Sequence, residues 1–111
     1  PISQSLGVSL IEIDMDENML SGSIPKGLFG LPNLTDVNLR DNLLSGGFPE
    51  TRDSVALNLE YINLSNNELS GTLPPTIGNF SNLSDLYLRG NRFSGSMPPR
   101  VGILLPGVRI F

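Results

Sequence analysis

The chain has 111 residues, of which 39% are hydrophobic, and it contains neither cysteine nor histidine. This composition is typical of one soluble domain, and it excludes disulfides, thiol nucleophiles, imidazole bases and the usual zinc, copper and haem ligands. The formal net charge of −4 disfavours nucleic-acid binding, and no apolar stretch approaches the roughly 20 residues that cross a bilayer. We therefore expect no cofactor, no metal ion, no nucleic-acid partner and no membrane segment in residues 1–111.

Four asparagines recur along the chain at a nearly constant spacing: Asn18, Asn42, Asn67 and Asn91. Each has apolar residues five and three positions before it, and a Leu or Phe, a Ser and a Gly after it. This frame resembles the leucine-rich repeat, in which each unit buries its apolar side only against its neighbours. We expect about four 24-residue repeats that start near residues 10, 34, 59 and 83, with a partial repeat at 1–9 and a partial fifth from about 107.

Each repeat begins with a Leu-x-x-Leu-x-Leu segment, which predicts a short strand because alternate residues of a strand point to opposite faces. In chain order, these strands are expected at residues 10–15, 34–39, 59–64 and 83–88. The expected fold is an α/β-type solenoid with parallel strands on its concave face. The strands place three apolar columns inside: Leu10, Leu34, Leu59 and Leu83; Ile13, Val37, Ile62 and Leu86; and Met15, Leu39, Leu64 and Leu88.

Irregular or 3-10 segments are expected on the convex face, where Gly and Pro follow each strand. The second repeat has one extra residue between Pro49 and Leu59, which predicts a bulge on the convex side. Neither end of the chain shows the polar cap that usually shields a repeat array. We expect exposed apolar ends that lead either to self-association or to a longer parent protein.

The recurring asparagines are predicted to form a buried ladder. An amide carries two donors and an acceptor, so it can bond backbone groups of its own coil and of the adjacent coil. Because all four positions repeat with the fold, we assign a structural role rather than ligand contact to the set Asn18, Asn42, Asn67 and Asn91.

The segment from Leu59 to Gly78 resembles the plant-specific leucine-rich repeat of receptor kinases, receptor-like proteins and polygalacturonase inhibitors. Residues 22–32, with the sequence GSIPKGLFGLP, resemble a stretch of the CLAVATA and barely-any-meristem group of receptor kinases. This resemblance implies an ectodomain that binds small secreted peptides along its concave strands. A co-receptor is a further partner that it suggests.

One contact of that group does not carry over to this chain. In the group, the strand before this stretch has an Arg-x-Arg pair that receives the free C-terminal carboxylate of the peptide. This chain has Glu12 and Asp14 at those places, and two anions repel a carboxylate. The departure leaves three alternatives, which are lost peptide binding, a changed ligand, or a decoy.

The outward strand positions form the predicted ligand-binding face: Glu12, Asp14, Asp36, Asn38, Arg40, Tyr61, Asn63, Asp85, Tyr87 and Arg89. Tyr61 and Tyr87 fall on adjacent strands as diagonal neighbours, so their rings are suited to hold an extended ligand or a side chain of a partner. The alternative is that they are two solvent-tolerant residues on strands that favour tyrosine.

Six acidic residues gather at one edge of the same face: Glu12, Asp14, Asp16, Glu17, Asp36 and Asp41. Three interpretations compete, which are a solvated face without a partner, attraction for a basic segment, and a Ca²⁺ site, which needs a closed shell of oxygens. Paired carboxylates also carry out glycoside hydrolysis. Nothing on an open face excludes water, so we expect that the chain is not an enzyme.

Four Asn-x-Ser/Thr sequons are candidates for glycosylation: Asn33, Asn63, Asn79 and Asn82. They fit a protein of the secretory pathway, although the repeat itself favours such triplets. We expect an extracellular or cell-surface recognition module that binds a peptide or protein and is part of, or derives from, a plant receptor-like kinase. The alternatives are an inhibitor of a pathogen cell-wall hydrolase and a degenerate array that docks to a full-length receptor.

Overall fold

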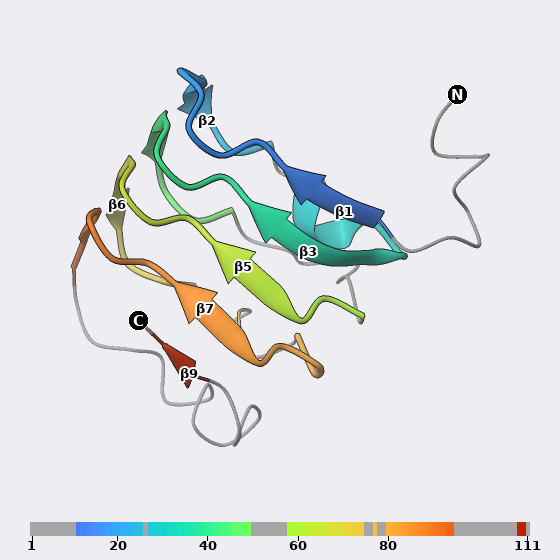
Figure 1. Cartoon of the computed structure of the whole chain (residues 1–111). Coiled ribbons are helices and arrows are strands. Elements are labelled where there is room, and N and C mark those ends of the chain that lie inside the picture. Colours follow the sequence, from blue (N-terminus) through green and yellow to red (C-terminus); the bar gives the residue numbers. More distant parts are fainter. Residues whose placement is uncertain are drawn as a thin grey trace.

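The computed structural model describes residues 11–25, 27–49, 58–74, 77, 80–94 and 109–110. The described coils are stacked side by side, and one parallel sheet forms their concave face (Figure 1). This five-stranded sheet consists of β1 (Ile11–Asp14), β3 (Leu34–Asn38), β5 (Tyr61–Asn63), β7 (Asp85–Tyr87) and β9 (Arg109–Ile110). The predicted parallel solenoid is therefore confirmed, and β9 lies where the spacing places the start of a fifth unit.

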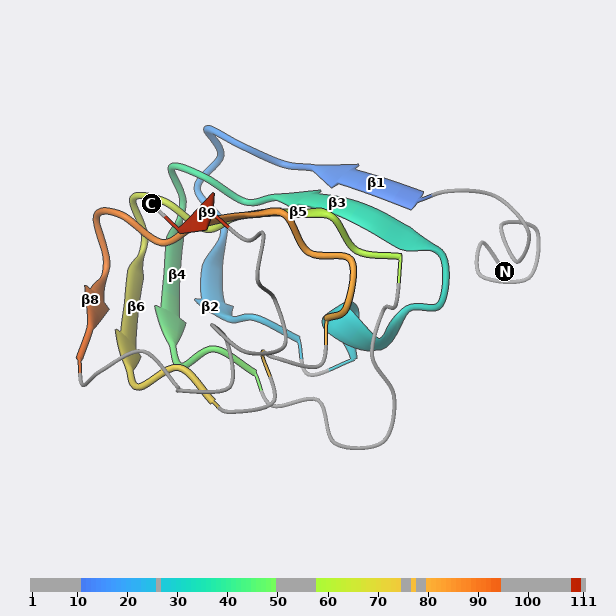
Figure 2. The same cartoon turned by 90° about the horizontal axis from the view of Figure 1, so that it is seen from below.

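A second parallel sheet, which was not predicted from the sequence, lies along a neighbouring side of the stack. Its four strands are β2 (Ser21–Ser23), β4 (Leu43–Gly46), β6 (Glu68–Gly71) and β8 (Arg92–Phe93). Figure 2 shows these strands running steeply away from the concave sheet. They form because the Leu-Ser-Gly stretches recur with the same period as the concave strands, so their backbone groups also meet in successive coils. A 3-10 turn, η1 (Leu28–Gly30), follows β2 on the convex return, and Ile77 also has 3-10 conformation two coils later.

The register of the concave sheet aligns equivalent positions of successive repeats. Ile13 pairs with Val37, Val37 with Ile62, Ile62 with Leu86, and Leu86 with Ile110. In the middle coils the inward residues Val37, Ile62 and Leu86 are fully buried. Each such side chain contributes about 1.5–3 kcal/mol through burial, so the aligned columns form the core of the stack.

Three phenylalanines add an aromatic cluster to the convex side of this core. The ring of Phe29, which is fully buried in η1, stacks on Phe48 with a centroid distance of 5.1 Å. The rings of Phe29 and Phe80 pack edge to face, with a centroid distance of 5.9 Å and an interplanar angle of 76°. Such pairs contribute about 0.5–1.5 kcal/mol beyond area burial. The cluster therefore ties together the returns of three coils.

The first described coil departs from the predicted core. Met15 was expected to point inward, but it is 50% exposed, whereas its equivalents Leu39 and Leu64 are buried. An inward residue is covered only when a coil lies on each side of it, and in the described structure Met15 has a neighbouring coil on one side. An apolar groove of about 330 Å³ opens there, with Met15, Leu20 and Leu44 in its lining.

The asparagine ladder is confirmed in the interior of the stack. Asn67 accepts a hydrogen bond from the Leu44 backbone N–H at 3.0 Å and donates to the carbonyl oxygens of Leu39, Leu64 and Ser65 at 3.0–3.3 Å. Asn42 makes the equivalent four bonds one coil earlier, and Asn91 makes three one coil later. Each of these amides thus joins the backbone of its own coil to that of the preceding coil.

Asn18 differs from the other members of the ladder, and the prediction that it is buried is wrong. Its side chain is exposed and donates to the carbonyl oxygen of Asp16, within its own coil, at 3.0 Å. The bonds that Asn42 makes to the preceding coil, at Leu20 and Met15, have no counterpart for Asn18 among the described residues.

The residue directly before each ladder asparagine has a left-handed backbone. The φ angles are 54° at Glu17, 59° at Asp41, 57° at Asn66 and 78° at Gly90. At Gly90 a Cβ atom would lie 3.1 Å from the backbone N and Cα of Asn66, so glycine is needed for space as well as for φ. This left-handed position is not evident in the sequence, because its residue type differs in each of the four repeats.

Some predictions fall outside the described residues. These are the partial repeat at 1–9, the inward residue Leu10 and the convex bulge, whose extra residue lies between Pro49 and Leu59. Within the described part of the chain, no helix is long and apolar enough to cross a membrane.

The ladder predicts that replacement of asparagine by alanine lowers the free energy of unfolding much more at one position than at another. Asn67→Ala should lower the free energy of unfolding by about 1–3 kcal/mol, because it leaves buried backbone groups without partners. Asn18→Ala should change it by less than about 0.5 kcal/mol, as is usual for an exposed residue. Urea unfolding followed by circular dichroism measures both values. Equal losses in the two variants would contradict the structural role of the ladder.

Candidate functional site

The outward side chains of the concave sheet form two columns whose members face each other across the strands. The first column contains Glu12, Asp36, Tyr61 and Asp85. The second contains Asp14, Asn38, Asn63 and Tyr87. Backbone hydrogen bonds continue past the strand ends, from Glu17 N–H to the Arg40 carbonyl and from Asp41 N–H to the Ser65 carbonyl. This alignment brings the predicted binding residues to one side of the molecule.

Tyr61 and Tyr87 lie side by side on β5 and β7, and their predicted adjacency is confirmed. Tyr61 faces Asp85 and Tyr87 faces Asn63, so the two tyrosines are diagonal neighbours. Their ring centroids are 5.4 Å apart with an interplanar angle of 51°, and both residues are partly exposed. The pair therefore presents one continuous aromatic surface, and its contact with a ligand stays a prediction.

Two asparagines of the predicted face also have a structural role that the sequence did not reveal. The Oδ1 atom of Asn38 accepts from the Arg40 N–H at 3.2 Å, and that of Asn63 accepts from the Ser65 N–H at 3.1 Å. Asn63 also donates from Nδ2 to the Tyr61 hydroxyl at 3.0 Å and is only 7% exposed. It therefore offers less surface to a ligand than its outward position predicts.

The glycosylation candidates lie in different environments. Asn82 is exposed and Asn33 is partly exposed, whereas the Nδ2 atom of Asn63 is engaged with Tyr61. Asn79 lies outside the described residues. A glycan on Asn63 Nδ2 would have to fit beside the Tyr61 hydroxyl at a residue that is only 7% exposed, whereas glycosylation of Asn33 and Asn82 stays a prediction.

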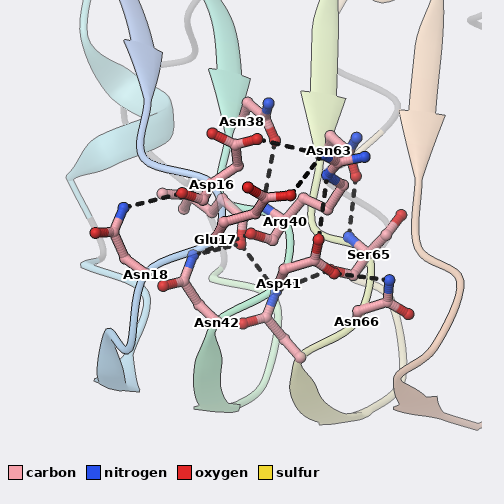
Figure 3. A network of polar contacts seen from close by, with 12 residues as sticks. Asp16, Glu17, Asn18, Asn38, Arg40, Asp41, Asn42, Asn63, Ser65 and Asn66 are labelled. Atoms are coloured by element: carbon pink, nitrogen blue, oxygen red, sulfur yellow. Dashed lines mark hydrogen bonds and ion pairs between the residues drawn. The ribbon is translucent and has the colours of Figure 1, made fainter.

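Arg40 occupies the middle of the acidic edge (Figure 3). Its Nη2 atom lies 3.3 Å from Asp16 Oδ2 and 3.6 Å from Glu17 Oε1, and its Nε atom lies 3.4 Å from Asp41 Oδ2. Asp41 in turn accepts a hydrogen bond from Asn66 Nδ2 at 2.8 Å. The Nε–H is shielded from solvent and makes no aligned hydrogen bond, so the Asp41 contact is electrostatic. One cation thus joins carboxylates from two coils.

Arg40 divides the six acidic residues into two groups. Asp16, Glu17 and Asp41 pair with it, whereas in the described part of the chain no cation pairs with Glu12, Asp14 or Asp36. Among the described residues, no three acidic side chains are grouped closely enough to hold a metal ion. What these residues offer is noncovalent recognition through carboxylates, amides and aromatic rings.

The Arg40 contacts predict a salt-dependent contribution to stability. Arg40→Met should lower the free energy of unfolding by about 1 kcal/mol at low ionic strength, since the pairs are partly exposed. The loss should shrink with added salt, which screens exposed charges. The control is Arg92→Met in β8, where the arginine is exposed. Urea unfolding at two salt concentrations tests this expectation, which fails if both variants lose the same stability at each concentration.

Comparison with known proteins agrees with this architecture. The family model described as Leucine Rich Repeat matches residues 9–31, 58–80 and 82–104. A comparison with curated protein sequences gives no match.

Several solved structures are similar to the chain. The ectodomain of the receptor kinase GASSHO1/SCHENGEN3 from Arabidopsis thaliana, in complex with CASPARIAN STRIP INTEGRITY FACTOR 2, is 30% identical, with a TM-score of 0.81 over 90% of this chain and 12% of that one. The Arabidopsis receptor kinase HAESA, in complex with the peptide hormone IDA and the co-receptor SERK1, is 32% identical, with a TM-score of 0.81 over 96% and 18%. The BIR3–SERK2 complex from Arabidopsis thaliana is 36% identical, with a TM-score of 0.78 over 93% and 55%.

The chain spans between 12% and 55% of the length of these three structures. The chain belongs to the leucine-rich repeat family, and its structural neighbours are ectodomains of plant receptor kinases.

Proposed function

We propose that the chain is an extracellular recognition module that binds an extended peptide or protein segment on its concave face. The observation that carries the proposal is the Tyr61–Tyr87 pair, whose rings lie 5.4 Å apart on adjacent strands of that face. Both rings are partly exposed although the frame of the repeat does not require an aromatic residue at either position. Tyrosine is enriched among the residues that contribute most to binding at protein interfaces.

The geometry around the pair suits recognition of an extended chain. Neighbouring strands lie about 4.8 Å apart, so the face presents a row of side chains at regular intervals. Tyr61 is flanked across the strands by Asp36 and Asp85. An aromatic centre with a polar rim is the usual arrangement of a protein-binding surface. A ligand would bury the rings while its polar groups bond the carboxylates and amides.

The structural neighbours support this proposal at the level of the family. HAESA is described in complex with a peptide hormone and a co-receptor, and GASSHO1/SCHENGEN3 with CASPARIAN STRIP INTEGRITY FACTOR 2. The extracellular location that we propose rests on the ectodomain nature of such neighbours. A co-receptor is the second partner that the HAESA complex suggests for this chain.

A second candidate function is docking to another receptor protein. It is favoured by the exposed apolar residues Met15 and Met19, which are 50% and 83% exposed, and by the likeness to the BIR3–SERK2 complex. Such docking would use the exposed methionines that follow β1 rather than the concave face. The experiment below separates the two because it measures dependence on the concave tyrosines.

The test uses peptides selected by the protein itself. A phage-displayed library of random dodecapeptides is panned on the immobilised chain, and the selected peptides are titrated calorimetrically. Tyr61→Ala combined with Tyr87→Ala should weaken their binding by about 2 kcal/mol, or roughly thirtyfold, because the aromatic anchor is lost. Circular dichroism checks that the variant stays folded.

Leu43→Ala is the matched control for this variant. Leu43 is 45% exposed in β4 of the other sheet, so its truncation also removes exposed apolar surface. The proposal is wrong if no peptides are selected, or if the selected peptides bind the tyrosine double variant as tightly as the native chain.

A further inference from the structure

We infer that the concave face selects a basic segment, with a lysine or arginine side chain of the partner seated between Asp36 and Tyr61. The inference rests on the proposed function and names the chemistry of the partner. It follows from how charge, register and the aromatic pair are distributed over the described strands, in four steps.

The first step is the uncompensated charge of the first two strands. The one arginine of this region, Arg40, is already shared by Asp16, Glu17 and Asp41. In the described structure the carboxylates of Glu12 and Asp36 have no hydrogen-bond or ion-pair partner, and that of Asp14 accepts only a long bond of 3.4 Å from the neutral Asn38 amide. The surface over β1 and β3 is therefore anionic and complementary to a cationic partner.

The second step is repulsion within this group. Glu12 on β1 faces Asp36 on β3 in direct register. Like charges opposite each other on neighbouring strands are destabilising. A cation above Glu12 and Asp36 would be attracted by both carboxylates. Binding of a cation would therefore relieve the repulsion that the two side chains exert on each other in the free protein. The arrangement favours cationic over neutral ligands.

The third step is the position of the aromatic pair. The register continues from Asp36 on β3 to Tyr61 on β5, one strand spacing away. A cationic side chain at this place would contact a carboxylate on one side and a ring face on the other. The face of a Tyr ring attracts the cation of an arginine or lysine side chain through cation–π contact, so the ring favours the same ligands as the carboxylate does. The tyrosines are thus an independent feature that favours a side chain of a polypeptide.

The fourth step is the spread of the charges. The unpaired carboxylates are distributed along two strands, and the described residues contain no group of acids suited to a metal ion. From β1 to β5 the face spans about 10 Å, which an extended chain covers in about three residues. Beyond the tyrosines, the exposed Arg89, which follows β7, carries the opposite charge. We therefore expect basic residues at one end of the segment only.

The test compares the peptide pools that different variants select. Panning of the dodecapeptide library at low salt, about 20 mM, should give sequences enriched in Lys and Arg on the native chain. The enrichment should fall at least about fivefold on Glu12→Gln combined with Asp36→Asn, and it should decrease at about 300 mM salt, where exposed charges are screened. The control is Glu60→Gln combined with Glu68→Gln, two exposed residues outside the paired concave positions, which removes the same charge.

A stability measurement distinguishes recognition from a structural role. Because Glu12 and Asp36 repel each other, the same double variant should raise the melting temperature at low salt by roughly 1–5 °C while it weakens basic binding. A structural role would lower the melting temperature instead, and that result overturns the inference.

The outcomes separate this inference from the proposed function. A pool that depends on Tyr61 and Tyr87 but shows no enrichment in Lys and Arg overturns only the inference, as does equal enrichment on both carboxylate variants. Selected peptides whose binding does not depend on Tyr61 and Tyr87 overturn both, as does a failure to select any peptide. Enrichment that is lost with Glu12→Gln and Asp36→Asn but kept with the control supports both.

Discussion

The hydrogen bonds of one buried amide per coil are the constraint on which the rest of this structure depends. Asn67 joins Leu39 and Leu44 of one coil to Leu64 and Ser65 of the next. These backbone groups lie where water cannot reach them, so without the amide they would be left without partners. The ladder therefore holds the spacing of the coils, and the spacing holds the strands in register and the outward side chains in columns.

The fold was predictable to the extent that it follows from the repeated frame. The parallel strands and the ladder bonds of Asn42 and Asn67 depend only on residues that recur at equivalent positions of successive repeats. The burial of Met15 and Asn18 was predicted wrongly because a frame does not say which coil lies at an edge. The aromatic cluster around Phe29 was missed because its rings come from different positions of the repeat, and Phe48 takes the place that Ile24 and Leu73 have in the neighbouring units.

The candidate site was predictable in outline for the same reason. Alternation along a strand identified the outward positions, and it placed Tyr61 beside Tyr87. It could not show that Arg40 pairs with three carboxylates or that Asn63 bonds the Tyr61 hydroxyl, because these contacts depend on side-chain conformations across neighbouring coils. The net negative charge of the edge was therefore visible in the sequence, whereas its division into paired and unpaired carboxylates was not.

The aromatic cluster on the convex side has a consequence for the opposite face. Phe29, Phe48 and Phe80 lock the returns of successive coils against one another, and close-packed rings resist the sliding and bending that would change the curvature of the stack. The strands that carry Asp36, Tyr61 and Tyr87 are consequently held at set distances before any partner arrives. A ligand then has little protein motion to arrest, so most of the entropy lost on binding would be its own.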